Sequence, residues 1–200
     1  MRHAERFREF VRDMTLLVDR AGYDEAAVLA EGPDLVAELV RHDGWLPDAF
    51  AEPEANAYRQ YLLHCDPLER FSVVSFVWGP GVGTPIHDHT VWGVIGMLRG
   101  AEVSQAYARD SMGGRLIEGE QTILTPGQTE CVSPKIGDIH VVRNALEDRP
   151  SISIHVYGAN IGAVKRHVFC PDTGMPSEFI SGYSNTACPN IWDRAKEAAA

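Results

Sequence analysis

The stretch Pro85-Ile86-His87-Asp88-His89-Thr90 decides the fold of this chain, together with His140 further along the sequence. In an extended strand, residues i and i+2 point to the same side, so His87 and His89 present two imidazoles to one face of a sheet. A third imidazole from another strand, that of His140, completes three corners of a metal's coordination shell. The other positions stay open for a substrate and for O₂ or water, as a catalytic metal site requires. The pattern therefore predicts an open metal site formed by three histidines.

Glycines, a proline and an asparagine frame these histidines at a characteristic spacing. The framing residues are Gly81, Gly93 and Gly100 around the first pair, and Gly127, Pro134, Gly137 and Asn144 around His140. The two segments resemble the two motifs of the cupin superfamily, G-x5-H-x-H-x3-E-x6-G and G-x5-P-x-G-x2-H-x3-N. The second match contains one extra residue on each side of Pro134. The resemblance implies an all-β cupin barrel, also called a jelly roll or double-stranded β-helix.

One position departs from the cupin pattern, because Gly93 stands where a glutamate ligand is expected. Three neutral imidazoles would leave the positive charge of the metal available to anionic ligands, which suits a substrate that binds through a thiolate. Asp88 lies between the two histidines and points to the opposite face. We interpret it as a carboxylate that supports the site from behind or lies on the surface.

The pattern of strands agrees with this fold. Runs rich in aromatic and β-branched residues are separated by Gly/Pro turns, as in an all-β sandwich or barrel. The expected strands cover residues 61–64, 71–78, 91–98, 102–108, 119–124, 129–133, 140–143 and 152–157. We predict one domain, 1–200, with a short helical N-terminal segment (1–45), a β-barrel (58–169) and an irregular C-terminal tail (171–200).

The N-terminal segment carries the apolar stripe of an amphipathic helix. The stripe consists of Phe7, Phe10, Val11, Met14, Leu17 and Val18, and Gly22 is placed to end the helix. Residues 25–40 are also helical in pattern, but Gly32-Pro33 interrupts them. We therefore predict two short helices in that stretch.

Composition excludes several classes of function. A net charge of −10 argues against binding to nucleic acid or to an anionic membrane, because both need basic patches. We find no apolar run long enough for a transmembrane helix and no signal peptide. The four cysteines form no CxxC pair, which favours reduced thiols in a cytoplasmic protein. Whether the chain forms a homo-oligomer is left open.

A second polar constellation lies near the end of the barrel. Ser153, His155 and Tyr157 alternate with Ile152, Ile154 and Val156, so the polar three share one face of a strand. If that face is the barrel interior, the serine holds the histidine, the histidine orients the tyrosine, and the hydroxyl of Tyr157 reaches the ligand. The alternative is a polar strip on the outside of the barrel.

These residues together resemble a thiol dioxygenase of the cysteine dioxygenase family. The resemblance covers roughly residues 58–169 and includes Trp78-Gly79 as well as the histidine motif. It implies Fe(2+) as the cofactor, with His87, His89 and His140 as its ligands. It also implies Ser153, His155 and Tyr157 as a catalytic triad that assists the oxidation of a small thiol by O₂.

Two departures from the animal enzymes bear on the substrate. Those enzymes have a cysteine crosslinked to the tyrosine where this chain has Gly93, so Tyr157 is expected to be uncrosslinked. They also have an arginine for the substrate carboxylate where this chain has Gln60. The chain thus resembles the bacterial glutamine-type 3-mercaptopropionate dioxygenases, in which a later arginine, matched here by Arg166, holds the carboxylate.

The chemistry of the substrate agrees with this assignment. 3-Mercaptopropionate offers a thiolate for the metal and a carboxylate for paired hydrogen bonds from a guanidinium. L-Cysteine adds an ammonium group that needs a metal or a counter-charge, and it is the alternative substrate. Arg166 as a surface cation and Gln60 as an ordinary strand residue are the alternatives for the two contacts. A non-catalytic or isomerase-type metal-binding cupin is the alternative function.

Overall fold

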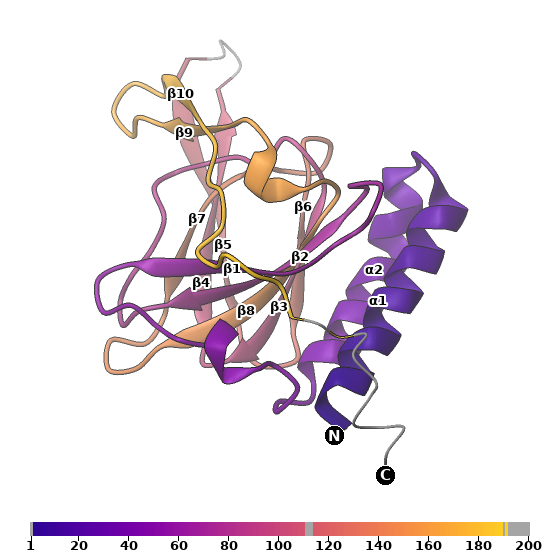
Figure 1. Ribbon diagram of the computed structural model, residues 1–200. Helices are drawn as coiled ribbons and strands as arrows, with labels where there is room; N and C mark the ends of the chain where they lie inside the picture. Colours follow the sequence, from indigo (N-terminus) through magenta and orange to yellow (C-terminus); the bar gives the residue numbers. More distant parts are fainter. Residues whose placement is uncertain (1, 111–113, 190, 192–200) are drawn as a thin grey trace.

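Two β-sheets enclose the interior of the molecule in the computed structural model, which describes residues 2–110, 114–189 and 191 (Figure 1). The first sheet has the strand order β1-β2-β8-β3-β6, and the second contains β5-β4-β7 and the pair β10-β9. The strands are β1 (Tyr58–Cys65), β2 (Ser72–Trp78), β3 (Gly93–Arg99), β4 (Glu102–Arg109), β5 (Leu116–Leu124), β6 (Thr129–Val132), β7 (Ile139–Asn144), β8 (Ser151–Tyr157), β9 (Arg166–Phe169) and β10 (Pro176–Phe179). Short 3₁₀ helices, η1 (Asp48–Phe50) and η2 (Ile161–Ala163), lie in the connections. The predicted cupin barrel is confirmed, and each of the eight expected strands is present.

The segment that carries the paired histidines connects the two parts of the second sheet. His87 forms bridges to His140 of β7 and to Val168 of β9. The backbone N–H of His87 donates to the carbonyl of His140 at 3.0 Å, and the N–H of His140 donates back at 3.0 Å. On the other side, the N–H of Phe169 donates to the carbonyl of Ile86 at 2.8 Å. The paired histidines therefore lie on extended backbone, as predicted, although the segment is too irregular to count as a strand.

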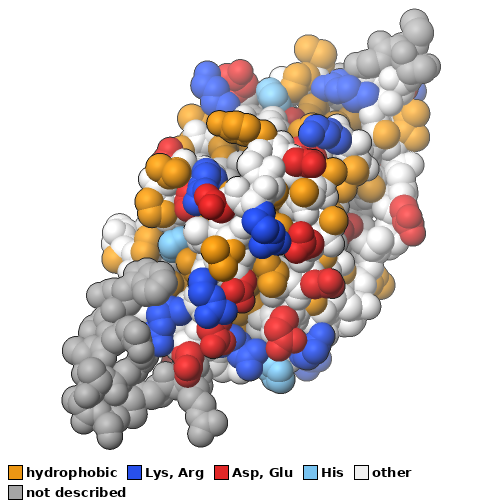
Figure 2. All heavy atoms as spheres, turned by 90° about the vertical axis from the view of Figure 1, so that its right-hand side faces the viewer, with side chains coloured by type: hydrophobic (Ala, Val, Ile, Leu, Met, Phe, Trp, Pro, Cys, Tyr) orange, Lys and Arg blue, Asp and Glu red, His pale blue; other side chains and the backbone are white. Residues whose placement is uncertain are grey.

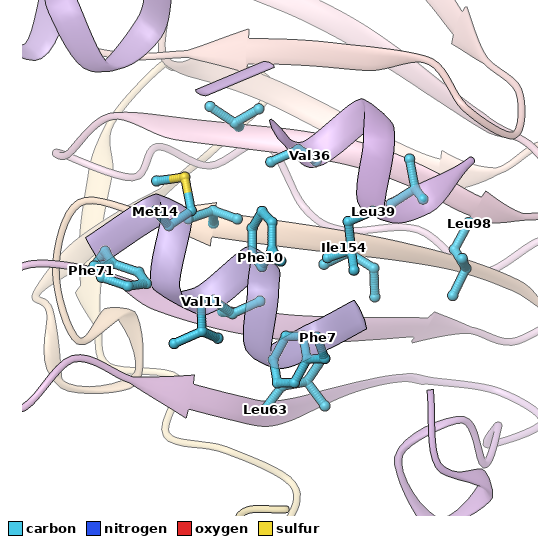
Figure 3. Packing of buried hydrophobic residues seen from close by; sticks show 14 of the residues in the cluster. Phe7, Phe10, Val11, Met14, Val36, Leu39, Leu63, Phe71, Leu98 and Ile154 are labelled. Carbon is cyan, nitrogen blue, oxygen red and sulfur yellow. The ribbon is translucent and has the colours of Figure 1, made fainter. Parts of the chain in front are cut away.

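Two helices cover the outer face of the first sheet. α1 (Arg2–Ala21) and α2 (Glu25–Val40) run side by side along the barrel (Figure 1), and their apolar side chains meet those of the sheet (Figure 3). The predicted stripe of α1 is confirmed, since its six residues are all buried: Phe7, Phe10, Val11, Met14, Leu17 and Val18. Each buried side chain of this size contributes roughly 1.5–3 kcal/mol relative to an exposed one. Gly22 ends α1 with a φ of +58°, a left-handed conformation that favours glycine.

The prediction of two short helices in residues 25–40 is wrong, because α2 is continuous through Pro33. Proline removes one helical hydrogen bond, and its ring usually crowds the residue before it. That residue is Gly32, which has no Cβ to crowd. Gly32 is buried, and a Cβ there would lie 3.6 Å from Val94 of the sheet. We infer that packing of α2 on the sheet outweighs the lost hydrogen bond.

The prediction of a wholly irregular C-terminal tail is also wrong. β10 pairs antiparallel with β9, and Phe179 lies opposite Arg166 in the register. The pair was missed because β9 and β10 are only four residues long and join the sheet through the histidine segment. Residues 190 and 192–200 of the predicted tail lie outside the described residues.

Charged side chains are spread over the outward face of the helices. Figure 2 looks onto this side of the molecule and shows basic and acidic side chains interspersed. Several of them pair: Arg20 contacts Glu31 at 2.8 Å, and Arg41 contacts Glu38 at 3.1 Å. Exposed pairs of this kind stabilise a fold by about 0–1 kcal/mol each. Among the described residues, none of the helices combines the length and the apolar character needed to cross a membrane.

Candidate metal centre and active site

The three predicted ligands meet inside the barrel. The candidate ligand atoms of His87, His89 and His140 all lie within 4.8 Å of one another, and all three side chains are buried. His87 and His140 are held opposite each other by their reciprocal backbone hydrogen bonds. The structure therefore brings together the three residues that the sequence pattern selected, in an arrangement that can hold one metal ion.

Each imidazole has its Nδ1 atom engaged by the protein. Nδ1 of His87 lies 3.1 Å from the carbonyl oxygen of Pro85, and Nδ1 of His140 lies 3.2 Å from the hydroxyl of Ser104. Nδ1 of His89 lies 2.9 Å from a carboxylate oxygen of Asp138. A histidine that donates through Nδ1–H presents the lone pair of Nε2 to a metal. The ring orientations are thus fixed by partners on three different segments.

Asp138 organises the turn after the ligand pair. Its carboxylate accepts from the backbone N–H of His89 at 3.1 Å and from that of Thr90 at 2.9 Å, in addition to the ring of His89. Thr90 has a φ of +60°, which is unfavourable for a β-branched residue by about 1–2 kcal/mol. The hydrogen bonds that His89 and Thr90 donate to Asp138 offset this strain and hold His89 in place.

Burial keeps His87 and His140 uncharged. It lowers the pKa of His87 to about 3 and that of His140 well below the usual value, with the neighbouring histidines adding to both effects. Burial alone would raise the pKa of Asp138, but hydrogen bonds from His89 and Thr90 hold it below its usual value. Near neutral pH these two histidines therefore offer neutral nitrogen ligands, and an ionised carboxylate backs the third histidine.

Asp88 matches neither predicted alternative, since it is buried and does not contact the candidate ligands. Its carboxylate accepts from the backbone N–H of His167 at 2.7 Å and contacts Nδ1 of the same residue at 2.8 Å. Asp88 is buried, and its contacts lie on β9 rather than on the ligands. Asp88 therefore fastens the histidine segment to β9.

The predicted polar relay is also formed. The hydroxyl of Ser153 lies 2.7 Å from Nε2 of His155, and Nδ1 of His155 lies 2.8 Å from the hydroxyl of Tyr157. The ring of Tyr157 stacks on that of His89, with centroids 5.3 Å apart. Burial lowers the pKa of His155 well below its usual value. Burial also raises the pKa of Tyr157 above its usual value. Both groups are therefore neutral, and the relay ends beside the candidate metal ligands.

The alternating pattern of β8 was ambiguous because both faces of the strand are buried. All seven residues of β8 are buried. The apolar residues Ile152, Ile154 and Val156 belong to the core beneath the helices. The polar residues therefore point into the barrel, and the alternative of an outer polar strip does not hold.

Gly93 packs directly against the relay. A Cβ added there would lie 3.0 Å from the ring of Tyr157 and 3.0 Å from Val132. These contacts are tighter than ordinary van der Waals distances. A side chain at this position would therefore displace Tyr157 or Val132.

The two predicted substrate contacts lie together, next to the C-terminal tail. Arg166 is only 3% exposed, and one of its terminal nitrogens donates to Ser181 at 2.6 Å. The amide of Gln60 donates to the same hydroxyl at 3.2 Å and to the carbonyl of Gly182 at 3.0 Å. The guanidinium of Arg166 also lies over the ring of Phe179, 4.7 Å from its centroid. Both residues are buried, so Arg166 is not a surface cation, and the role of Gln60 in the substrate pocket stays a prediction.

Arg166 interacts electrostatically with His87, one of the candidate metal ligands. Burial lowers the pKa of Arg166, while the negative charge of Asp88 acts in the opposite direction. The positive charge of Arg166 in turn disfavours protonation of His87. Its Nε has no hydrogen-bond partner among the described residues although it is buried. An unpaired buried donor costs about 1–3 kcal/mol, so this nitrogen is a candidate for binding an anion.

Several residues of this site were not identified from the sequence. They are Asp138, Ser104, Ser181 and Glu102, each of which lies against a predicted site residue. Asp138 lies two positions before His140, so the alternation of an extended strand could have placed the two side chains on the same face. The others come from distant segments, and no local pattern connects them to the site.

Comparison with known proteins agrees with this geometry. A profile of the family "Cysteine dioxygenase type I" matches residues 34–168, about two thirds of the chain. The chain belongs to the cysteine dioxygenase type I family. Among individual proteins, "Cysteine dioxygenase type 1" of Bos taurus is 29% identical over 113 residues, which are 56% of this chain and 55% of that protein. The protein of the same name from Homo sapiens is 28% identical over 107 residues, 52% of each chain. This member of the family thus spans about half the length of the curated relatives it matches.

Solved structures give more distant similarities. The protein TT1209 from Thermus thermophilus superimposes with a TM-score of 0.43 at 19% identity, over 56% of this chain and 92% of that one. A cupin superfamily protein from Desulfitobacterium hafniense gives a TM-score of 0.44 at 13% identity, over 60% of this chain and 94% of that one.

Proposed function

We propose that this member of the cysteine dioxygenase family is a mononuclear non-haem iron thiol dioxygenase that acts on 3-mercaptopropionate. The reaction converts R–SH and O₂ into the sulfinic acid R–SO₂H, so both oxygen atoms end on sulfur and no further reductant is consumed. The observation that carries the proposal is the combination of an open three-histidine centre with a buried arginine whose Nε lacks a partner among the described residues.

The residues of the centre fit a divalent ion. His87, His89 and His140 are buried and oriented by partners on Nδ1, as metal-binding imidazoles are. Imidazole suits Zn, Cu and Ni as well as Fe, and membership of the family supports Fe(2+). The ion would bind the substrate thiolate and activate O₂.

The protein's own contribution is positioning. Arg166 offers a guanidinium that can hold a carboxylate, with Ser181 fixing one end of its fork. Tyr157, oriented by His155 and Ser153, offers a hydroxyl beside the ligand His89. The apolar walls of the barrel exclude bulk water and strengthen each of these interactions.

The choice of 3-mercaptopropionate follows from the charges near Arg166. This substrate needs one cation to bind its carboxylate. It has no amine, so the site needs no negative charge to bind one. Gln60, which shares Ser181 with Arg166, is neutral. L-Cysteine is the second candidate substrate, and the names of the curated relatives favour it. The four cysteines are all unpaired, which suits a reducing compartment such as the cytoplasm.

The test is oxygen consumption by the iron-loaded protein with each thiol. We expect one sulfinate per O₂ consumed and a higher kcat/KM for 3-mercaptopropionate than for L-cysteine. A His140→Ala variant, which lacks one ligand, is the control and should consume no O₂. A higher kcat/KM for L-cysteine would reverse the substrate assignment. Stoichiometric zinc in the purified protein, without iron-dependent O₂ uptake, would instead favour an isomerase-type or ligand-binding cupin.

A further inference from the structure

A buried carboxylic acid lies at the far end of the relay. Glu102 is the first residue of β4 and is 1% exposed. The hydroxyl of Ser153 and the indole N–H of Trp78 lie near its carboxyl group and lower its pKa. Neither of its oxygens has a hydrogen-bond partner among the described residues. A buried polar group left in this state is costly, so its presence calls for a compensating role.

The relay itself can exist in two directions. Ser153 accepts from the indole N–H of Trp78 at 3.2 Å, which leaves one lone pair and one hydrogen on its oxygen. If that hydrogen goes to His155, then His155 donates through Nδ1–H to Tyr157, and the hydroxyl hydrogen of Tyr157 is free to point towards the metal centre. If His155 instead donates to Ser153, it must accept from Tyr157, and that hydrogen is turned away.

We propose that Glu102 is a positioning residue that selects the first direction by donating a proton to the oxygen of Ser153. With Trp78 and Glu102 both donating, the two lone pairs of Ser153 are filled and its hydrogen can go only to His155. Tyr157 then accepts from His155 and keeps its own hydrogen for the substrate site. The role rests on the proposed function, in which the hydroxyl of Tyr157 assists the reaction.

The surroundings of Glu102 favour the protonated form that this role needs. Burial raises the pKa of Glu102 to about 8 because its effect exceeds the lowering by Ser153 and Trp78, and the charge of Glu130 on β6 adds to the rise. The titratable groups of β8 nearby, His155 and Tyr157, are both neutral. Loss of the proton to solvent would turn Glu102 into an acceptor. Ser153 would then donate to it, and the whole relay would reverse.

Two substitutions at Glu102 separate direction from packing. Glu102→Gln keeps a donor for Ser153 and does not titrate, while Glu102→Leu is of similar size and donates nothing. We expect kcat of the parent to fall above pH of about 8 with the loss of one proton. Glu102→Leu should lower kcat near pH 7 by about tenfold with little change in KM, since an interaction worth about 1.4 kcal/mol in the transition state is lost. Glu102→Gln should recover most of that activity and lack the alkaline decline.

The control is Glu130→Gln, which removes the other nearby carboxylate. Glu130 bonds to Thr122 and lies outside the relay, so the alkaline decline should persist in this variant. The proposal is overturned if Glu102→Leu keeps the parent kcat, or if the decline persists in Glu102→Gln or disappears in Glu130→Gln.

A second measurement does not depend on activity. Infrared difference spectra of the metal-free protein should contain the C=O band of a protonated carboxylic acid near pH 7. The band should vanish as the pH rises through about 8, and it should be absent from Glu102→Gln. Absence of the band from the parent refutes the role of Glu102. A parent protein with the band but without thiol oxidation would refute the proposed function and leave the protonation of Glu102 established.

Discussion

The substitution Asp138→Asn tests how the turn after the histidine pair holds the metal ligands. The carboxylate of Asp138 accepts from three N–H groups: the backbone of His89, the backbone of Thr90 and the ring of His89. Asparagine has one acceptor oxygen, and its NH₂ group would face donors. At least one of the three hydrogen bonds must therefore be lost, while the shape of the side chain is kept.

The size of the effect follows from these contacts. A hydrogen bond to a charged group contributes about 1.5–3 kcal/mol, and loss of a partner that orients a metal-binding histidine typically weakens metal affinity by about 10–100-fold. We expect the dissociation constant for the ion to rise by about 10–100-fold. The assay is competition with a coloured chelator, using Co(II) or Zn(II) so that O₂ does not interfere.

Asp88→Asn is the matched control. Asp88 lies between the two ligands in the sequence, but it bonds to His167 rather than to an imidazole of the centre. It should therefore weaken metal binding clearly less than Asp138→Asn. Equal losses in the two variants, or unchanged affinity in Asp138→Asn, would refute the assigned role of Asp138.

Three further predictions concern the interior of the barrel. Arg166→Met should lower kcat/KM for 3-mercaptopropionate by about 30–1,000-fold, corresponding to about 2–4 kcal/mol. Arg166→Lys should recover only part of the lost kcat/KM, because lysine lacks the planar fork of arginine. Parent-like kinetics in Arg166→Met would contradict this role. Tyr157→Phe and His155→Ala should each lower kcat but not metal content, and the double variant should be no slower than the slower of the two single variants; additive losses would mean that they do not act through one relay. Glu102→Gln should stabilise the protein increasingly between pH of about 5 and about 8, because the folded parent retains a proton that the unfolded chain releases near its usual value of 4.5. The gain at pH 7 relative to acid pH should be on the order of 3 kcal/mol in urea unfolding, and parallel curves for parent and variant would contradict it.

Local patterns were sufficient to predict the parts of the fold that depend on local chemistry. The histidine pair predicted the metal centre because side chains two residues apart on extended backbone point to the same face. The apolar stripe of α1 predicted the buried side of this helix because apolar residues at helical spacing lie on one side. The eight strands of the prediction follow from residue types that favour extended backbone and from the turns between them.

What the sequence left open depends on contacts between distant segments. Alternation along β8 could not tell inside from outside, because the helices bury the face that carries Ile154. The break expected at Pro33 does not occur, because the sheet beneath Gly32 supports the helix there. Likewise, no local sequence pattern connects Arg166 with the residues of the tail that it contacts.

The division of β8 into two faces has a consequence for how this protein can be altered. Its odd-numbered residues, from Ser151 to Tyr157, point into the barrel, and its even-numbered residues pack under the helices. Mutational libraries confined to the odd positions would therefore vary the proposed active site at nearly constant helix packing. Libraries at the even positions would select for thermal tolerance instead, so a single strand offers two independent routes for engineering.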